Sequence, residues 1–234
     1  MTTVAFIAGC KPENDLDKED VKGGDVLDCV DLGLPSGILW ATCNMGAATP
    51  EGFGDYFAWG ETKTKTTYCW STYKYCNKGE GWNTLTKYCN DTYYGYNGFA
   101  DNLITLQPSD DAAIVNGGIG WRMPVGLEWE ELYQNTTHTW TTQNGVNGRL
   151  FTASNGNSLF LPAAGCRLGD EFNFVGLIGG YWSSSLDTVH PSSAWYFSFG
   201  SGDYGMGGGG RSFGLSVRPV LQCTVPQEKL CDFH

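Results

Sequence analysis

The stretch from Gly180 to Val220 constrains the fold more than any other part of the sequence. Its segment 194–200 alternates between large aromatic residues and smaller or polar ones. Because successive side chains of a β-strand point to opposite faces, this alternation predicts a strand with one set of side chains in a core and the other facing outward. The core set is Trp195, Phe197 and Phe199, and the outward set is Tyr196, Ser198 and Gly200.

A glycine-rich segment follows this strand and continues its outward set. Four consecutive glycines, Gly207 to Gly210, are its most prominent feature, and single bulkier residues interrupt it at Met206 and Arg211. The segment closes with Ser-Val-Arg-Pro-Val at 216–220. We interpret the bulkier residues as a fixed frame and the positions between them as exchangeable.

The frame YWSSSL...P..AW.F.F.SG...M....R..G.SVRP resembles the variable region of the target proteins of diversity-generating retroelements. In that family a reverse transcriptase copies a template and introduces base substitutions at its adenines, so that asparagine codons change to other codons ending in a pyrimidine. Lys, Glu, Gln, Met and Trp cannot arise by that route, and Trp182, Trp195 and Met206 all occupy frame positions. The alternative is an ordinary glycine-rich region of a lectin-like fold.

The resemblance implies a ligand-binding face made of eighteen exchangeable positions, none of which carries a residue that the route forbids. They are Asp187, Val189, His190, Ser192, Ser193, Tyr196, Ser198, Gly200, Asp203, Tyr204, Gly205, Gly207, Gly208, Gly209, Gly210, Ser212, Phe213 and Leu215. Among them, the rings of Tyr196, Tyr204 and Phe213 are candidate anchors, since aromatic residues carry much of the energy of recognition. Asp187, His190 and Asp203 would add polar contacts.

The overall composition fits a loop-rich domain that contains β-structure. The 234 residues include 33 glycines, 14% aromatic residues and 17% charged residues. The net charge of -11 argues against binding to the phosphates of nucleic acids. No run of apolar residues reaches the length that a membrane span needs.

Residues 1–25 differ from the rest of the chain. The sequence IAGC at 7–10 resembles a bacterial lipobox in which Cys10 would become the lipidated first residue, and an acidic, non-aromatic tether follows it. No Lys or Arg precedes the apolar run, which departs from the usual signal pattern. The alternative is an arbitrary N-terminus that contains a cysteine. We expect a ligand-binding domain at 26–221 and a tail at 222–234.

The segment 30–61 is dense in Gly, Pro and aromatic residues, and it resembles the opening of the Fibrobacter major paralogous domain family. That resemblance implies an α+β C-type lectin-like fold, with small twisted antiparallel sheets, two helices and extensive irregular loops. Short strands are expected around the turn Pro35-Ser36-Gly37. The tyrosine-rich insert 63–107 is interpreted as an irregular loop that packs its own rings, and the alternative is a contact surface.

Two helices and a hairpin ladder are expected between the insert and the frame. A helix is predicted over 108–115, with Ser109 as its N-cap, and a second over 124–134. Strong turn signals at Asn144-Gly145, Asn147-Gly148 and Asn155-Gly156 predict the ladder over 140–160. A polar loop is expected to connect the ladder to the frame.

The residues Gly120 to Pro124, taken with Glu128-Trp129, resemble a signature of the sulfatase-modifying enzymes and their lectin-fold relatives. In those proteins the Arg and Glu belong to the scaffold, so we assign them no catalysis. The acidic pairs Asp110-Asp111 and Glu130-Glu131 are interpreted as solvated helix faces. No hydrolase triad, phosphate loop or calcium-lectin motif is visible, so no catalytic residue, metal or cofactor is predicted.

Nine cysteines are present, and eight remain for disulfides if Cys10 carries lipid. The pairs Cys76 with Cys89 and Cys223 with Cys231 are the first to consider, and free thiols are the alternative.

The sequence thus predicts a monomeric binding protein rather than an enzyme, lipid-anchored at the bacterial outer-membrane surface. Its expected partner is a protein or glycan on another cell, phage or host surface. A phage receptor-binding protein, similar in design to phage tropism determinants, is a close variant of this prediction. Two hypotheses compete with it: a non-varying adhesin or glycan-binding module of the same fold, and an enzyme of the sulfatase-modifying type.

Overall fold

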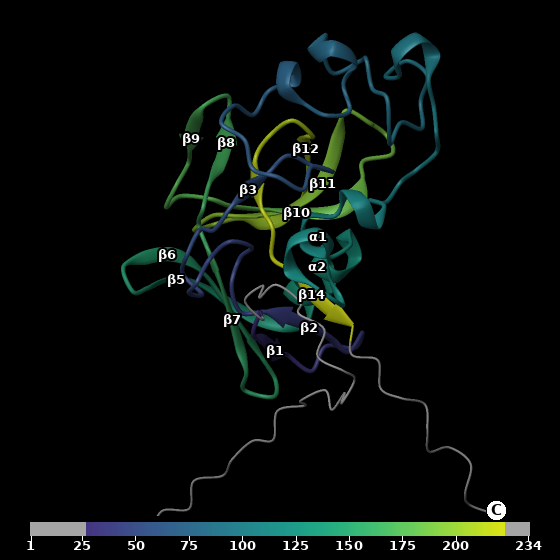
Figure 1. Ribbon diagram of the computed structural model, residues 1–234. Coiled ribbons are helices and arrows are strands. Elements are labelled where there is room, and N and C mark those ends of the chain that lie inside the picture. The colour runs from purple at the N-terminus through teal and green to yellow at the C-terminus, as the bar shows by residue number, and fades with distance from the viewer. Residues whose placement is uncertain (1–26, 223–234) are drawn as a thin grey trace, which may run out of the picture.

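The computed structural model describes residues 27–222, which form an α+β arrangement of two helices and four small sheets (Figure 1). The strand ladders are antiparallel except for the pairing of β10 with β13. The predictions for Cys10, for the tether and for the pair Cys223 with Cys231 lie outside the described residues. The last strand ends at Gln222, one residue beyond the expected domain boundary.

The elements follow one another with long irregular connections between them. The helices are the short 3-10 segments η1 (Trp70–Thr72), η2 (Asn77–Gly79), η3 (Tyr96–Gly98) and η4 (Pro108–Asp110), together with α1 (Ala112–Gly117) and α2 (Gly126–Gln134). The strands are β1 (Cys29–Asp31), β2 (Ile38–Ala41), β3 (Tyr56–Phe57), β4 (Trp121–Arg122), β5 (Thr136–Gln143), β6 (Val146–Ala153), β7 (Ser158–Pro162), β8 (Cys166–Leu168), β9 (Glu171–Asn173), β10 (Gly179–Leu186), β11 (Ser193–Phe199), β12 (Tyr204–Gly210), β13 (Leu215–Ser216) and β14 (Val220–Gln222).

The central sheet, in the order β12-β11-β10-β13-β3, holds most of the frame and separates two hydrophobic clusters. Phe197 and Phe199 belong to the cluster on the face where α2 and the β5–β7 ladder lie. Trp182 and Ala194 belong to the cluster on the other face, which the insert completes. The sheet therefore has buried side chains on both faces, as expected for a strand set with elements packed on each side.

The second sheet, in the order β1-β2-β14-β4, joins the two ends of the described chain. Arg218, two residues before β14, is fully buried and donates to the Asn44 side chain and to the carbonyl oxygens of Ala41 and Thr42. Burial lowers the pKa of Arg218 to about 10. Since a buried cation is tolerated only with hydrogen-bond partners, these carbonyl groups explain why the frame contains an arginine here.

The predicted ladder is present as β5–β7, and its turns fall at Asn144-Gly145 and at Asn155-Gly156. The third predicted turn, Asn147-Gly148, is wrong. Gly148 lies inside β6, where it pairs with Thr141 and Pro162. A Cβ atom there would lie 2.4 Å from the carbonyl oxygen of Leu161, so this glycine serves close strand approach rather than a turn.

The second predicted helix forms as α2, and the first begins later than predicted. Residues 108–110 form a 3-10 turn, and α1 starts at Ala112. Its N-cap is Asp111 rather than Ser109, because the Asp111 carboxylate accepts from the backbone N–H groups of Ala113 and Ile114. The same carboxylate accepts from the Met123 N–H, so it also fixes the strand that precedes α2.

The interpretation of Asp110-Asp111 as a solvated face is wrong, because both side chains are buried. Asp110 forms ion pairs with Lys87 at 2.6 Å and Lys74 at 3.1 Å, and it accepts a hydrogen bond from the Tyr88 hydroxyl. Burial by itself would raise the pKa of Asp110, but the hydrogen bonds from Lys87, Tyr88 and Lys74 hold it well below its usual range. Asp110 therefore joins two parts of the insert to the start of α1.

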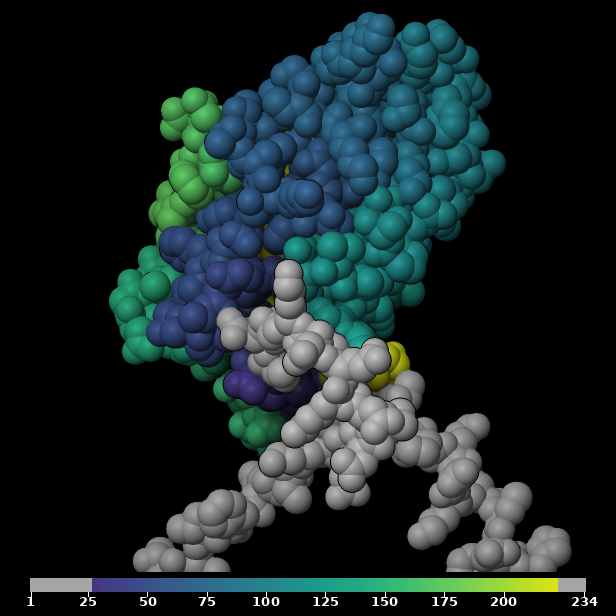
Figure 2. Space-filling view, in the orientation of Figure 1, coloured from purple at the N-terminus to yellow at the C-terminus, as the bar shows by residue number. Residues whose placement is uncertain are grey.

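The insert 63–107 packs its own rings, as the sequence indicates. Tyr68, Tyr73, Tyr75 and Tyr88 are buried and form part of one cluster. Their rings meet edge to face, for example Tyr75 and Tyr88 at 5.6 Å between centroids. Figure 2 shows the insert as a continuous blue and teal surface that covers the strands of the C-terminal region on this side of the molecule.

Two further predictions concern single contacts. Arg122 and Glu128 pair with each other in a bidentate ion pair, with nitrogen–oxygen distances of 2.7 and 2.5 Å, which agrees with a scaffold role. Cys76 and Cys89 are free thiols rather than a disulfide. Each sulfur contacts backbone carbonyl groups of its own loop instead, Gly81 for Cys76 and Asp91 for Cys89.

In the part of the chain that the structure describes, no helix is long and apolar enough to cross a membrane.

Candidate ligand-binding face

The alternation of 194–200 forms strand β11 as predicted, but only two of the three aromatic residues enter the core. Phe197 stacks on Trp129 of α2 with 5.2 Å between ring centroids, and Phe199 stacks on Tyr181. Trp195 is 37% exposed, so its predicted burial is wrong. It points to the same face as Phe197, but it lies opposite Gly208, beyond the rings of α2 that cover the rest of the strand.

Two neighbouring hollows, which we call the groove, lie over β11 and β12 and share Ser198 and Ile178. Their volumes are about 330 and 280 Å³. Twelve of the eighteen exchangeable positions line them. The first hollow takes Ser198, Gly200, Asp203, Tyr204, Gly205 and Gly207, and the second takes Tyr196, Ser198, Gly208, Gly209, Gly210, Phe213 and Leu215.

Three glycines form the floor of the groove, because Gly207, Gly209 and Gly210 each lie against an aromatic ring. Cβ atoms added at Gly207 and Gly209 would lie 3.4 and 3.1 Å from the nearest ring atom of Tyr196. A Cβ atom at Gly210 would lie 3.1 Å from the ring of Phe213. The rings therefore rest on bare backbone, and larger residues at these three positions would have to displace them.

One wall of the groove comes from residues that the sequence reasoning did not assign to a site. Gly165, Cys166 and Leu168 line it from the β8 hairpin, and Phe174 and Ile178 line it from the segment before β10. This region was expected to be a polar loop, but Phe172, Phe174, Val175 and Leu177 are all exposed apolar side chains. The apolar run FVGLI at 174–178 was the available signal, since exposed apolar residues gathered in one place often mark interaction sites.

The hairpin between β11 and β12 closes the other end of the groove. Tyr204 is 46% exposed, and its ring meets His138 at 4.2 Å between centroids. The Arg149 guanidinium lies over the same ring at 4.9 Å, contacts His138 Nδ1 and donates to the Gly200 carbonyl. Burial and the nearby Arg149 charge lower the pKa of His138, so its ring is neutral at pH 7. The cation that supports the Tyr204 ring is therefore the Arg149 guanidinium.

Six exchangeable positions lie outside the groove: Asp187, Val189, His190, Ser192, Ser193 and Ser212. Asp187 is buried, and its carboxylate accepts from the N–H groups of Val189 and His190. This turn leaves Val189 and His190 exposed at the end of β10. Asp187 thus organises the loop instead of offering a free polar contact.

Besides Asp187, the side chains of two other exchangeable positions are buried. Ser212 is enclosed in the turn after β12, and Leu215 belongs to the cluster that contains Trp182. Leu215 pairs with Phe57 of β3, and the return of the chain into the central sheet carries it inward. The sequence alternation could not reveal this, because the partner strand comes from a distant part of the chain.

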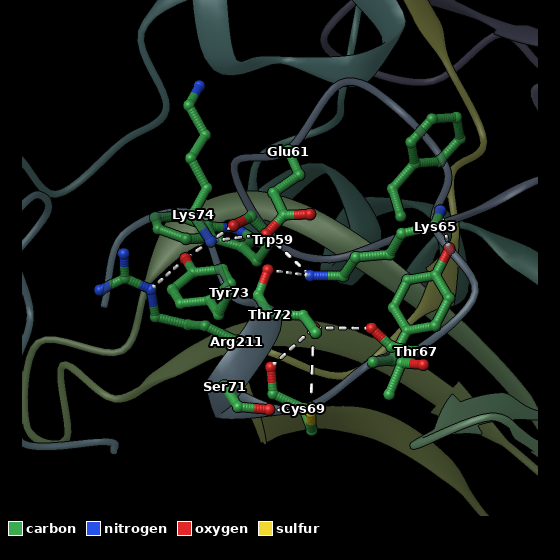
Figure 3. Close-up of polar contacts among 12 residues, drawn as sticks. Trp59, Glu61, Lys65, Thr67, Cys69, Ser71, Thr72, Tyr73, Lys74 and Arg211 are labelled. Carbon is green, nitrogen blue, oxygen red and sulfur yellow. Dashed lines mark hydrogen bonds and ion pairs between the residues drawn. The ribbon is translucent and has the colours of Figure 1, made fainter. Parts of the chain in front are cut away.

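Arg211 attaches the end of β12 to the insert (Figure 3). Its guanidinium is fully buried and donates to the Tyr73 hydroxyl and to the carbonyl oxygens of Tyr88, Pro191 and Lys87, at 2.9 to 3.0 Å. The charge also lies over the Trp59 ring at 4.9 Å. Tyr73 in turn donates to the Trp59 carbonyl, so hydrogen bonds hold the end of β12 against the insert.

A second polar network lies in the same region and involves Cys69 and Lys65 of the insert. The Cys69 thiol contacts the hydroxyls of Ser71 and Thr72, and Lys65 donates to Glu61 and to the Thr72 carbonyl (Figure 3). The hydrogen bond with Ser71 lowers the pKa of Cys69. These residues lie on the insert and do not line the groove.

The groove itself carries little charge. Asp203 is the one ionisable carboxylate or base among the described residues that line it. Burial raises the pKa of the Cys166 thiol, so this cysteine is protonated at neutral pH. In the described chain, no group of three or more His, Cys, Asp or Glu side chains is placed to hold a metal ion. The groove is suited to contact through rings, backbone groups and hydroxyls.

Comparisons with models of protein families, with curated proteins and with solved structures gave no match for this chain.

Proposed function

We propose that this chain is a ligand-binding protein whose groove residues are exchanged by retroelement-directed mutagenesis while its frame stays fixed. The observation that carries the proposal is the division of the C-terminal region into two sets. Twelve exchangeable positions line the groove, whereas Tyr181, Trp182, Phe197, Arg211 and Arg218 are fully buried. Apart from the buried Leu215, exchange at the first set changes the surface that a ligand meets, and exchange at the second would disrupt the core.

Several features support a C-type lectin-like fold as the scaffold. Two helices, small twisted sheets and long irregular connections agree with the fold that the sequence resemblance implies. We propose a monomer anchored by lipid on Cys10 at the bacterial outer-membrane surface, with a phage virion as the variant location. Its partner would be a protein or glycan on another cell, phage or host.

Direct contact by rings is the binding mode that the groove favours. Tyr204 and Phe213 are 46% and 36% exposed, while Tyr196 lies partly buried across the glycine floor. Aromatic residues that are held rigidly provide large contact area at low entropic cost. A non-varying adhesin would use the same groove with a single sequence.

Deep sequencing of the 3′ end of the coding region tests the proposal in a growing population and in related isolates. We expect substitutions at the exchangeable positions that match adenines of a nearby template copy, with frame codons unchanged. A segment without variation, or substitutions spread evenly over frame and groove codons, would sink the proposal. In that case the groove belongs to a fixed binding site.

A further inference from the structure

The outer edge of β12 presents backbone groups whose role the groove alone does not explain. β12 is the outermost strand of the central sheet and, within residues 27–222, pairs only with β11. The bond from the Gly200 N–H to the Asp203 carbonyl fixes which residues face the partner strand, and so does the bond from the Arg211 N–H to the Ser192 carbonyl. Because bonded and non-bonded pairs alternate in an antiparallel ladder, every second residue of β12 directs its N–H and C=O groups away from β11.

Those outward residues are Tyr204, Met206, Gly208 and Gly210. Apart from the Gly210 carbonyl, which accepts from Phe213 N–H, their backbone groups form no hydrogen bond with any described residue. Unpaired strand edges are usually protected by lysine, proline or short length. β12 has seven residues and contains neither a charged residue nor a proline. Its glycines also leave the backbone without side chains to shield it.

The surroundings of this edge indicate what would pair with it. The adjoining wall presents the exposed side chain of Phe174, which lines the same hollow as Gly208 and Gly210. Leu177 is also exposed, and its carbonyl oxygen lies 3.6 Å from where a Cβ atom at Gly200 would stand. Asp203 stands exposed at the start of the strand, and the whole chain carries a net charge of -11. A partner segment that is apolar and not acidic complements both the wall and this charge.

We propose that β12 binds its ligand by strand addition: an extended, apolar, non-acidic segment of another protein pairs with the outward groups of Tyr204, Met206 and Gly208. Alternate side chains of that segment then enter the groove, since side chains of neighbouring strands share a face. This inference rests on the proposed function and specifies the class of ligand. Main-chain pairing would also let the exchangeable side chains alter specificity while a constant set of backbone bonds supplies affinity.

The test uses a displayed library of random 12-residue linear peptides, selected in parallel on the full chain, on Gly208→Ala and on Gly208→Pro. Both substitutions add a Cβ atom, which would lie 3.0 Å from Asp187 Oδ2, but only proline removes the outward N–H. We expect peptides enriched on the wild type to bind Gly208→Ala at least about tenfold more tightly than Gly208→Pro, as loss of one or two hydrogen bonds requires. Equal binding to the two variants, or no enrichment over the proline variant, overturns the proposal.

A second readout does not depend on the fold of a variant. N-methyl groups placed singly along a selected peptide should abolish binding at alternate residues only, because every second N–H of an added strand faces β12. Uniform tolerance of N-methylation contradicts strand addition. Sedimentation of the chain without peptide tests whether the edge instead pairs with a second copy of this chain. A dimer that Gly208→Pro dissociates would assign the edge to that second copy and overturn the proposed partner.

The peptide selection and the sequencing experiment can fail independently of each other. Variation in the gene without peptide pairing leaves a diversified groove that binds in another way, whereas peptide pairing without variation leaves a fixed site with this ligand class.

Discussion

Gly210 and Arg211 are neighbours in the chain, yet they belong to regions built on opposite principles. Gly210 ends a glycine-rich strand whose outer edge has no partner strand in the described part of the chain. Arg211 is fully buried and places its guanidinium among four oxygen acceptors of the insert and the β10–β11 loop. One peptide bond therefore separates the surface of the groove from a cation that the fold surrounds completely.

The difference teaches how a protein could vary its surface without losing its fold. Burying a cation without a carboxylate is costly unless every donor finds an acceptor, so the frame around Arg211 must keep its geometry. The groove makes few such demands, because no buried cation of the described chain lines it and its rings lie partly exposed. The buried charge and its hydrogen bonds therefore lie beside the groove rather than within it.

Replacing Arg211 should give the largest effect. We expect Arg211→Met to lower the free energy of unfolding by about 3–5 kcal/mol, because three carbonyl oxygens and the Tyr73 hydroxyl lose their donor inside the core. Urea unfolding measures this loss. Arg167→Met is the control, since Arg167 donates to carbonyl groups at a half-buried position and should cost about 1 kcal/mol. Equal losses in the two variants would remove the distinction between frame and surface.

Leu215 sharpens the comparison, because it is an exchangeable position by sequence and a core residue by structure. We expect Leu215→Asn to cost about 3 kcal/mol, since it removes packing and buries an amide. Phe213→Asn, two residues away and 36% exposed, should cost less than about 1 kcal/mol in the same unfolding measurement. If the Leu215 variant is as stable as the Phe213 variant, the boundary of the frame is misplaced.

Asp110 gives a prediction about how the stability of the fold depends on pH. We expect Asp110→Asn to lose about 2 kcal/mol at pH 7, because the carboxylate pairs with Lys87 and Lys74 in a buried setting. The pKa of Asp110 is lower in the folded state than in the unfolded state. The carboxylate therefore contributes fully to stability above the unfolded-state pKa of about 4, and the contribution is lost as the pH falls through the lower folded-state pKa. Unfolding curves of wild type and variant should therefore converge in acid. A gap that stays constant down to about pH 2 contradicts the ion-pair explanation.

His138 gives the smallest expected effect. Because burial and the Arg149 charge both disfavour its protonated form, NMR should show its ring titrating below about 6.5. In Arg149→Gln the charge is absent, and the pKa of His138 should rise. Titration at or above the ordinary value in the wild type would mean that the support under Tyr204 is arranged differently.

Elements with strong local signals could be predicted from the sequence. α2, the β5–β7 ladder and the alternation of β11 all follow from periodicity and from turn residues such as Asn144-Gly145. The packing of tyrosine rings within the insert also follows from its composition. These features depend on neighbours close in sequence, so a pattern of a few residues is enough.

Features that depend on distant partners could not be predicted. Asp110 is buried because Lys74 and Lys87 of the insert reach it, and no spacing reveals that contact. Trp195 is exposed because α2 ends its coverage before it, although its parity matches that of Phe197. The wall of the groove was missed for the same reason, since β8 meets β12 only through the fold.

The central claim is that groove and frame differ in their tolerance of exchange, and a saturation scan of residues 180–220 tests it most directly. Each variant would be displayed on cells and scored by resistance to protease, which reports folding and needs no ligand. The account predicts broad tolerance at groove positions such as Ser198, Asp203 and Phe213, and intolerance at Trp182, Arg211 and Arg218. Equal tolerance in the two sets would contradict it.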